Sequence, residues 1–227
     1  MFFAVDIDGV LARDTNGYAR YLNNYFSLGI TDEKIGQLQN YQEFTKLLEV
    51  KAYIRQSEET CAQFNTVARE AQYLSEIQHA KIPMPGSREA MEVIAKHYPF
   101  YYVTCRKSVT SATTHAWLTR NGFPSPDRVH YCERGIYEKY VIAHRLAEPG
   151  ESILLIDDLA LKLMKSFATV IKLDRTLASD LIRRVGLLAF GHADAPVWPF
   201  PRRPFHVEPL PDWEHFYELI GTKRLSA

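Results

Sequence analysis

The sequence predicts an α/β fold: a parallel β-sheet covered by helices, with a helical segment inserted after the first strand. Three observations lead to this fold class. Short, nearly continuous apolar runs are typical of strands buried on both faces of a sheet. Helical segments separate most of these runs. One long stretch near the N-terminus has helical periodicity without any strand-like run.

Five apolar runs are predicted to be strands: residues 2–5, 100–103, 128–131, 152–156 and 169–173. Helices are predicted between them at 87–96, 108–121 and 138–146. Ser87 is the expected N-cap of the first helix, and Gly122 is the expected left-handed terminator of the second. These connections are short enough for right-handed crossovers between parallel strands.

Residues 14–81 contain several segments with helically spaced apolar residues and no strand-like run. We therefore predict two domains, an α/β core formed by residues 1–13 and 82–227 and a helical cap formed by residues 14–81. The alternative is that these helices form one thick layer of the core.

The C-terminal part is rich in proline, with six of the twelve prolines between residues 196 and 211. This composition predicts an extended surface segment, followed by a last helix at about 213–220. A proline-motif ligand for an SH3-like domain is the alternative, but the interleaved aromatic residues favour packing of this segment against its own domain.

Composition excludes several classes of protein. Lys+Arg and Asp+Glu both total 27 among 227 residues, so no net field attracts a nucleic acid polymer or an anionic membrane. The three cysteines, Cys61, Cys105 and Cys132, form no CxxC pair, which argues against a disulfide framework. No run of 18 apolar residues and no signal-peptide pattern occurs. We therefore expect a soluble cytoplasmic protein.

Chemically active side chains follow three of the predicted strands, and a lysine opens the helix before the fourth strand. Open parallel sheets bind ligands at the carboxyl ends of their strands, so these side chains are expected to converge. They are Asp6 and Asp8 after the first strand, Thr104 after the second, Asp157 and Asp158 after the fourth, and Lys139.

A site with this composition suits phosphoryl transfer. Clustered carboxylates repel one another unless a divalent cation neutralises them, and hard oxygen ligands favour Mg²⁺. One of Asp6 and Asp8 would attack phosphorus and the other would act as acid and base. Lys139 and Thr104 would stabilise charge on the phosphoryl oxygens. Lys162 and Lys165 are less suitable than Lys139, because Lys162 follows the acidic pair.

Three further residues are candidates for substrate binding: Gly9, Cys105 and Arg106. Gly9 allows a tight turn and a close approach of the backbone to phosphate. Cys105 and Arg106 follow Thr104 directly. The alternatives are that Cys105 is a small buried thiol and that Arg106 is an idle surface cation. His115 and His192 lack accompanying catalytic motifs and are expected to be structural or surface residues.

These motifs resemble those of the haloacid dehalogenase-like phosphatases. The sequence DIDGV at residues 6–10 is similar to the family's first motif DxDG[TV], Thr104 to the second, Lys139 to the third and Asp157-Asp158 to the fourth. The resemblance implies a Rossmann-like core, Asp6 as nucleophile and Asp8 as acid/base. It further implies Mg²⁺ held by the Asp6 carboxylate, the Asp8 backbone carbonyl and Asp157, with Asp158 supporting the metal shell through water or orienting Lys139.

Within that family, DIDGVLA, TCRK, WLTRNGFP and LLIDDLA look most like the 5'-nucleotidase and 5'(3')-deoxyribonucleotidase branch. The resemblance implies a Mg²⁺-dependent phosphomonoester hydrolase acting on a small phosphorylated metabolite, with nucleoside monophosphates as the preferred class. A sugar-phosphate phosphatase and a non-catalytic phospho-ligand binding protein are the alternatives. A receiver domain is disfavoured, because its acidic pair lies near the first strand.

Overall fold

The computed structural model describes residues 1–14, 16–38, 41–194, 196–197 and 205–222. The chain forms two compact units. The first, here called the core unit, comprises Met1–Ala12 and Pro83–Ala227; the second, the helical unit, comprises Arg13–Ile82. Among the described helices, none has the length and apolar character needed to cross a membrane.

The core unit contains a six-stranded sheet in the order β5-β4-β1-β6-β7-β8, and all five strand pairs are parallel. Val5 at the end of β1 pairs with Tyr102 in β4 and with Ile156 in β6. The chain fills one side of β1 first and the other side later, which creates a topological switch point beside β1. The strands are β1 (Phe2–Val5), β4 (Phe100–Thr104), β5 (Val129–Tyr131), β6 (Ile153–Asp157), β7 (Val185–Phe190) and β8 (His206–Leu210).

The prediction of a strand at 169–173 is wrong, because these residues end the helix α10 (Ala160–Leu173). The buried residues of α10 recur at helical spacing and include Ala160, Leu163, Met164, Phe167 and Val170. This longer periodicity outweighs the strand preference of the Thr-Val-Ile run. The next strand after β6 is instead β7, whose sequence VGLLAF is a continuous apolar run.

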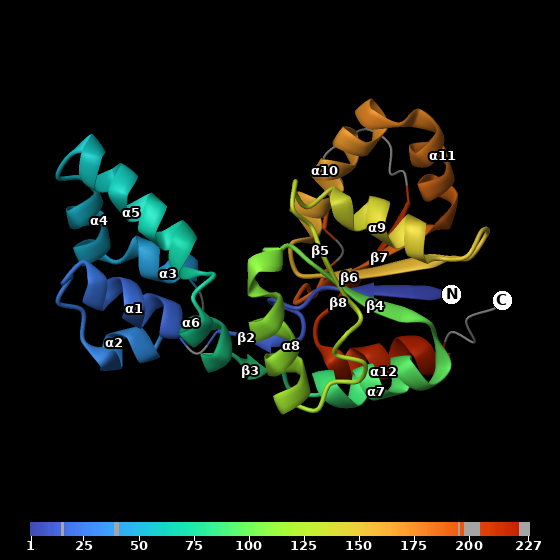
Figure 1. The fold of residues 1–227 in the computed structure, drawn as a ribbon, viewed down its shortest axis with the longest axis horizontal. Helices are drawn as coiled ribbons and strands as arrows, with labels where there is room; N and C mark the ends of the chain where they lie inside the picture. Colours follow the sequence, from blue (N-terminus) through green and yellow to red (C-terminus); the bar gives the residue numbers. More distant parts are fainter. Residues whose placement is uncertain (15, 39–40, 195, 198–204, 223–227) are drawn as a thin grey trace. The chain divides into compact units, whose positions relative to one another are not determined.

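Helices cover both faces of the sheet (Figure 1). On one face lie α9 (Glu138–Leu146), α10 and α11 (Arg175–Arg184), which pack around the buried residues Tyr140 and Phe167. On the other face lie α7 (Ser87–His97), α8 (Ser111–Arg120) and α12 (Trp213–Thr222), which pack around Trp117 and Trp213. A short 3₁₀ turn, Ser108–Thr110, precedes α8.

The predicted helix at 138–146 is confirmed, as is the left-handed Gly122, whose φ is 73°. The predicted N-cap of α7 is wrong by one residue. Gly86 occupies the cap position with a φ of 73°, and the Ser87 hydroxyl instead donates to the Met84 carbonyl at 2.7 Å.

The proline-rich segment predicted to be extended is described only in part, because residues 198–204 lie outside the described part of the chain. Its later residues form β8, which pairs in parallel with β7 from Gly186–His206 to Phe190–Leu210. The last helix, predicted at about 213–220, is α12.

The helical unit has its own apolar core, which includes Leu22, Phe44, Val50 and Phe64. Its helices are α1 (Gly17–Tyr25), α2 (Asp32–Gly36), α3 (Tyr41–Lys46), α4 (Leu48–Ile54), α5 (Glu58–Ala71) and α6 (Ser75–Ala80). Where the chain passes between the units, β2 (Ala12–Arg13) and β3 (Ile82–Pro83) pair as a two-stranded sheet.

Candidate active site

Asp6 is the first residue after β1, and the hydrogen bonds of its neighbours hold it at the sheet edge. Its backbone amide donates to the Ile156 carbonyl at 3.0 Å, which continues the β1–β6 ladder. The amide of Ile7 donates to Asp6 Oδ1 at 2.8 Å. The Asp6 side chain is buried, and the Ile7 amide holds one of its oxygens.

The loop after Asp6 is closed by its own backbone and by the C-terminal helix. The amides of Leu11 and Ala12 both donate to the Ile7 carbonyl at 2.9 Å. The indole Nε1 of Trp213, in α12, donates to the Val10 carbonyl at 2.9 Å. Trp213 is fully buried, so this bond anchors the loop to a rigid part of the core.

Lys139 joins two of the acids. It lies in the first turn of α9, and its Nζ is 2.7 Å from Asp6 Oδ2 and 2.5 Å from Asp157 Oδ2. Burial disfavours its charge, but the nearby Asp157 and Asp6 carboxylates outweigh burial and raise the pKa of Lys139 well above its usual value. The lysine is therefore a permanent buried cation between two carboxylates.

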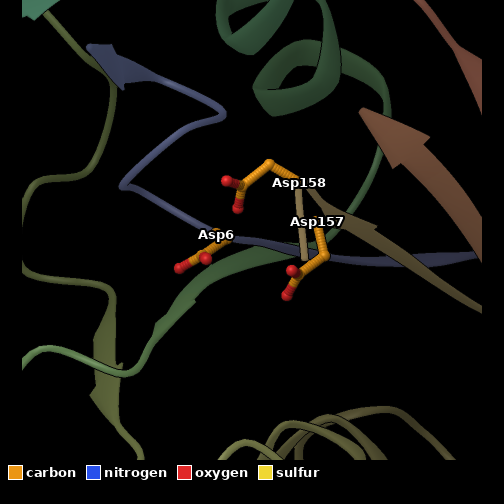
Figure 2. A group of neighbouring side chains, drawn as sticks. All are labelled: Asp6, Asp157 and Asp158. Carbon is orange, nitrogen blue, oxygen red and sulfur yellow. The ribbon is translucent and has the colours of Figure 1, made fainter. Parts of the chain in front are cut away.

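Asp6, Asp157 and Asp158 form an acidic cluster at the adjoining ends of β1 and β6 (Figure 2). One carboxylate oxygen from each lies within 4.8 Å of the others. Burial, together with the neighbouring carboxylates, raises the pKa of Asp6 to about 6 and that of Asp158 to about 7. Both groups are therefore destabilised as anions in the absence of a further cation.

The acidic cluster fits a hard divalent cation. Asp158 Oδ1 is buried, and within the described part of the chain it has no hydrogen-bond partner. An orphaned buried carboxylate oxygen is costly unless a ligand completes its coordination. The all-oxygen donor set favours Mg²⁺ or a similar hard cation over softer metals.

Gly9 is required by two features of this site. Its φ of +80° is a left-handed conformation that favours glycine. A Cβ built at this position would also lie 2.2 Å from Asp158 Oδ2. The sequence predicted that Gly9 allows close approach of phosphate, whereas the structure places the Asp158 carboxylate against it.

The Asp8 carboxylate does not belong to the acidic cluster. It pairs with Arg106, whose Nη2 lies 2.7 Å from Asp8 Oδ1 and whose Nε lies 2.9 Å from Oδ2. The prediction that four acidic side chains converge therefore holds for three of them only, because this ion pair satisfies Asp8. Arg106 is buried in the pair and is not the idle surface cation considered as an alternative.

Thr104, the last residue of β4, is buried beside these groups. Its hydroxyl accepts a hydrogen bond from the Arg106 backbone amide at 3.2 Å. A hydroxyl that accepts this bond keeps its own proton to donate.

Cys105 is exposed, so the alternative that it is a small buried thiol is wrong. A hydrogen bond with the buried Cys132 thiol is the largest of the effects that lower the pKa of Cys105. The same bond raises the pKa of Cys132. All three cysteines are free thiols.

Within the described part of the chain, none of the remaining candidates forms a side-chain hydrogen bond or ion pair with the carboxylates of the acidic cluster. Lys162 and Lys165 are exposed on α10, so Lys139 is the lysine that meets the acids. His115 is exposed, and His192 Nε2 lies 3.4 Å from the Asp158 carbonyl oxygen.

Sequence reasoning missed two residues that support the site. Thr114 accepts a hydrogen bond from Arg106 Nη1 at 3.2 Å, and it lies one helical turn before the buried Trp117. That spacing marks Thr114 as inward-facing and was the available signal. The bond from Trp213 to Val10 joins residues 203 positions apart, and no local pattern announces such a contact.

No protein-family model matches the chain, and no curated protein matches it. Solved structures do. A HAD family hydrolase from Deinococcus radiodurans R1, with bound phosphate and sodium, is 16% identical; the match covers 96% of this chain and 94% of that chain, with a TM-score of 0.53.

A HAD-superfamily hydrolase of subfamily IA from Geobacter sulfurreducens PCA is 17% identical, with 97% and 96% of the two chains covered and a TM-score of 0.52. A haloacid dehalogenase-like family hydrolase from Streptococcus pneumoniae is 15% identical, with 83% of each chain covered and a TM-score of 0.50. Identities this low establish shared architecture alone. The chain therefore has the α/β fold of the haloacid dehalogenase-like hydrolases.

Proposed function

We propose that this protein is a Mg²⁺-dependent phosphomonoester hydrolase that acts through an aspartyl phosphate on Asp6. The observation that carries the proposal is the buried arrangement of Asp6, Lys139 and Asp157 at the sheet's switch point, with Lys139 Nζ 2.7 Å from Asp6 Oδ2. A carboxylate held beside a fixed cation suits attack on an anionic phosphoryl group.

In the first step an Asp6 carboxylate oxygen bonds to phosphorus while the ester P–O bond breaks. The leaving alkoxide takes a proton from the Asp8 carboxyl. In the second step water attacks phosphorus, gives its proton to the Asp8 carboxylate, and the bond between Asp6 and phosphorus breaks. Asp6 is regenerated and inorganic phosphate leaves.

Lys139 and Thr104 serve the phosphoryl group. The Lys139 charge is preorganised by two carboxylates and offsets negative charge as it grows in the transition state. The Thr104 hydroxyl accepts from the Arg106 amide and can donate its proton to a phosphoryl oxygen.

Asp6, Asp157 and Asp158 are the residues that would hold the Mg²⁺ ion. When bound, the cation supplies positive charge that screens Asp6 from the incoming phosphate and stabilises the phosphoryl oxygens. The raised pKa values of Asp6 and Asp158 support this assignment, because a cation relieves the cost of ionising both groups.

Nucleoside monophosphates are the substrate class we propose first, on the sequence resemblance of DIDGVLA and LLIDDLA; sugar phosphates are the second. The helical unit departs from the core four residues after Asp8, and we assign it the role of the cap that selects the leaving group. Free cysteines support a reducing, cytoplasmic setting.

The test is phosphate release from nucleoside monophosphates, sugar phosphates and p-nitrophenyl phosphate, with and without Mg²⁺. We expect metal-dependent turnover that falls by about 10³-fold or more in Asp6→Asn. Asp127→Asn removes an exposed carboxylate and should leave the rate unchanged. Acid-quenched protein should carry phosphate on Asp6, detectable by mass spectrometry.

Three outcomes would contradict parts of this proposal. Turnover by Asp6→Asn at the parent rate excludes the mechanism. Equal or better use of sugar phosphates excludes nucleotides as the preferred class. Absence of turnover on every ester, with Mg²⁺ present, excludes the hydrolase and favours a phospho-ligand binding protein.

A further inference from the structure

The Arg106 guanidinium is buried while the carboxylate it binds is not. The Arg106 side chain is 1% exposed and the Asp8 side chain 37% exposed. A buried guanidinium is costly unless its N–H groups are hydrogen-bonded. The hydrogen-bond partners of the Arg106 guanidinium therefore indicate its role.

Each guanidinium nitrogen donates to an oxygen of the core unit. Nε and Nη2 grip the two Asp8 oxygens at 2.9 and 2.7 Å, and Nη1 donates to Thr114 Oγ1 at 3.2 Å. The guanidinium carbon also lies 5.9 Å from the centroid of the buried Trp117 ring. The group is thus anchored to α8 on one side and holds Asp8 on the other.

We propose that Arg106 is a positioning residue: its two-pronged grip fixes the Asp8 carboxyl in the orientation from which it exchanges a proton with the leaving group. This inference rests on the proposed function. A lone aspartate on a loop samples several rotamers, whereas a bidentate guanidinium fixes both the place and the plane of the carboxyl group. A carboxylate oxygen has two lone pairs, so accepting a hydrogen bond from a guanidinium does not by itself prevent it from exchanging a proton.

A direct phosphate contact is the competing role, and the two roles differ in kinetics. A phosphate ligand serves every ester alike. Proton transfer to the leaving oxygen matters little for p-nitrophenolate, a stable anion, and greatly for an alkoxide. Loss of a positioning residue should therefore slow alkyl esters more than aryl esters.

The experiment compares kcat/KM, which includes only the steps up to formation of the aspartyl phosphate, for p-nitrophenyl phosphate, phenyl phosphate and glycerol 2-phosphate. It uses four variants: Arg106→Met, Arg106→Lys, Asp8→Asn and the double variant Arg106→Met/Asp8→Asn. We expect Arg106→Met to lower kcat/KM about 10²-fold or more on glycerol 2-phosphate and about 10-fold or less on p-nitrophenyl phosphate. Arg106→Lys keeps the positive charge but cannot donate two parallel hydrogen bonds to Asp8. Its kcat/KM should therefore lie between those of Arg106→Met and the parent protein. The double variant should be no slower than Asp8→Asn, because both changes remove one function.

Controls separate positioning from folding. Arg88→Met removes an exposed arginine from α7 and should change neither rate nor leaving-group dependence. Thr114→Val keeps the Arg106–Asp8 pair but removes the hydrogen bond that Arg106 Nη1 donates to Thr114. It should show the same leaving-group dependence as Arg106→Met, with a smaller loss of activity. Thermal unfolding of each variant confirms that the protein measured is folded.

The outcomes are distinct from those of the proposed function. Equal loss of kcat/KM on all three esters, or additive losses in the double variant, would overturn the positioning role while leaving the hydrolase intact. If Asp6→Asn keeps the parent rate, the hydrolase itself fails and this inference fails with it.

Discussion

The two aspartates of the first loop lie two residues apart, yet their surroundings differ. Asp6 is buried, shares Lys139 with Asp157, and has a pKa raised to about 6 by burial. Asp8 is partly exposed, and both of its carboxylate oxygens accept hydrogen bonds from the Arg106 guanidinium. One loop thus presents two carboxylates in opposite settings, one crowded by other acids and one neutralised by a dedicated cation.

This difference suits a division of labour. A nucleophile gains from a water-poor site in which fixed charges act strongly. A group that exchanges protons with a leaving group and with water needs access to both. The same contrast predicts that substitutions lower stability most in the buried ion network of Asp6, Lys139 and Asp157. Substitutions around the partly exposed Asp8 should lower it less.

The largest effect on stability is expected from Lys139→Met. The change leaves the buried Asp6 and Asp157 carboxylates without their shared cation, and breaking such a pair typically costs about 3–5 kcal/mol. Chemical denaturation of the metal-free protein measures this loss. Lys162→Met, on the exposed side of α10, should cost little. A loss below about 1 kcal/mol for Lys139→Met would show that the network is not the stabilising feature inferred here.

A smaller but still large effect is expected from Gly9→Ala. The left-handed φ of +80° and the 2.2 Å approach of Asp158 Oδ2 to a Cβ should together cost about 2–3 kcal/mol. Gly150→Ala is the matched control, since Gly150 has a φ of +79° and no atom within 4 Å of a built Cβ. If both variants lose the same stability in denaturant titrations, backbone strain explains everything and the carboxylate contact contributes nothing.

The smallest effect concerns pH. Burial raises the pKa of Asp158 to about 7 from a usual value of 3.8, so the native state binds this proton more tightly than the unfolded state does. The associated stability is fully present below about pH 4 and is lost as the pH rises through about 7. Asp158 is only half-buried, so solvent screens part of this effect. Metal-free protein should therefore lose about 2 kcal/mol between pH 4 and 7.5 from this group, roughly half of what the full pKa difference would give.

Asp158→Asn removes the titrating group and should flatten that pH dependence, as followed by denaturation at several pH values without divalent cations. Asp127→Asn, at an exposed position, should keep the parent profile. An Asp158→Asn profile as steep as that of the parent would mean that Asp158 is ionised at little cost in the native state.

The strands that carry the site were predictable because their signal is local. β1, β4 and β6 are short apolar runs. β4 and β6 end at Thr104 and Asp157, which the sequence predicted to be chemical, and β1 ends one residue before Asp6. Parallel order then brings these ends together without further information. The convergence of Lys139 on Asp6 and Asp157 follows from the same topology, because α9 leads into β6.

The features that escaped prediction depend on distant or competing interactions. The Arg106–Asp8 pair joins residues 98 positions apart, and it removes Asp8 from the acidic cluster that spacing alone predicted. The error at 169–173 arose because a β-branched run was judged without the helical spacing that precedes it from Ala160 to Phe167. Local propensity fails where a longer pattern or a partner elsewhere in the chain outweighs it.

The pairing of β2 with β3 has a consequence for how such a chain diversifies. Neighbouring paired strands lie about 5 Å apart, so the whole helical unit leaves and re-enters the core at nearly one point. A folded insertion with adjoining ends imposes little loop-closure entropy on its host, much as a tight hairpin turn would. We therefore expect the helical unit to be exchangeable. Another domain, or a simple turn, could join Ala12 to Pro83 without redesign of the sheet.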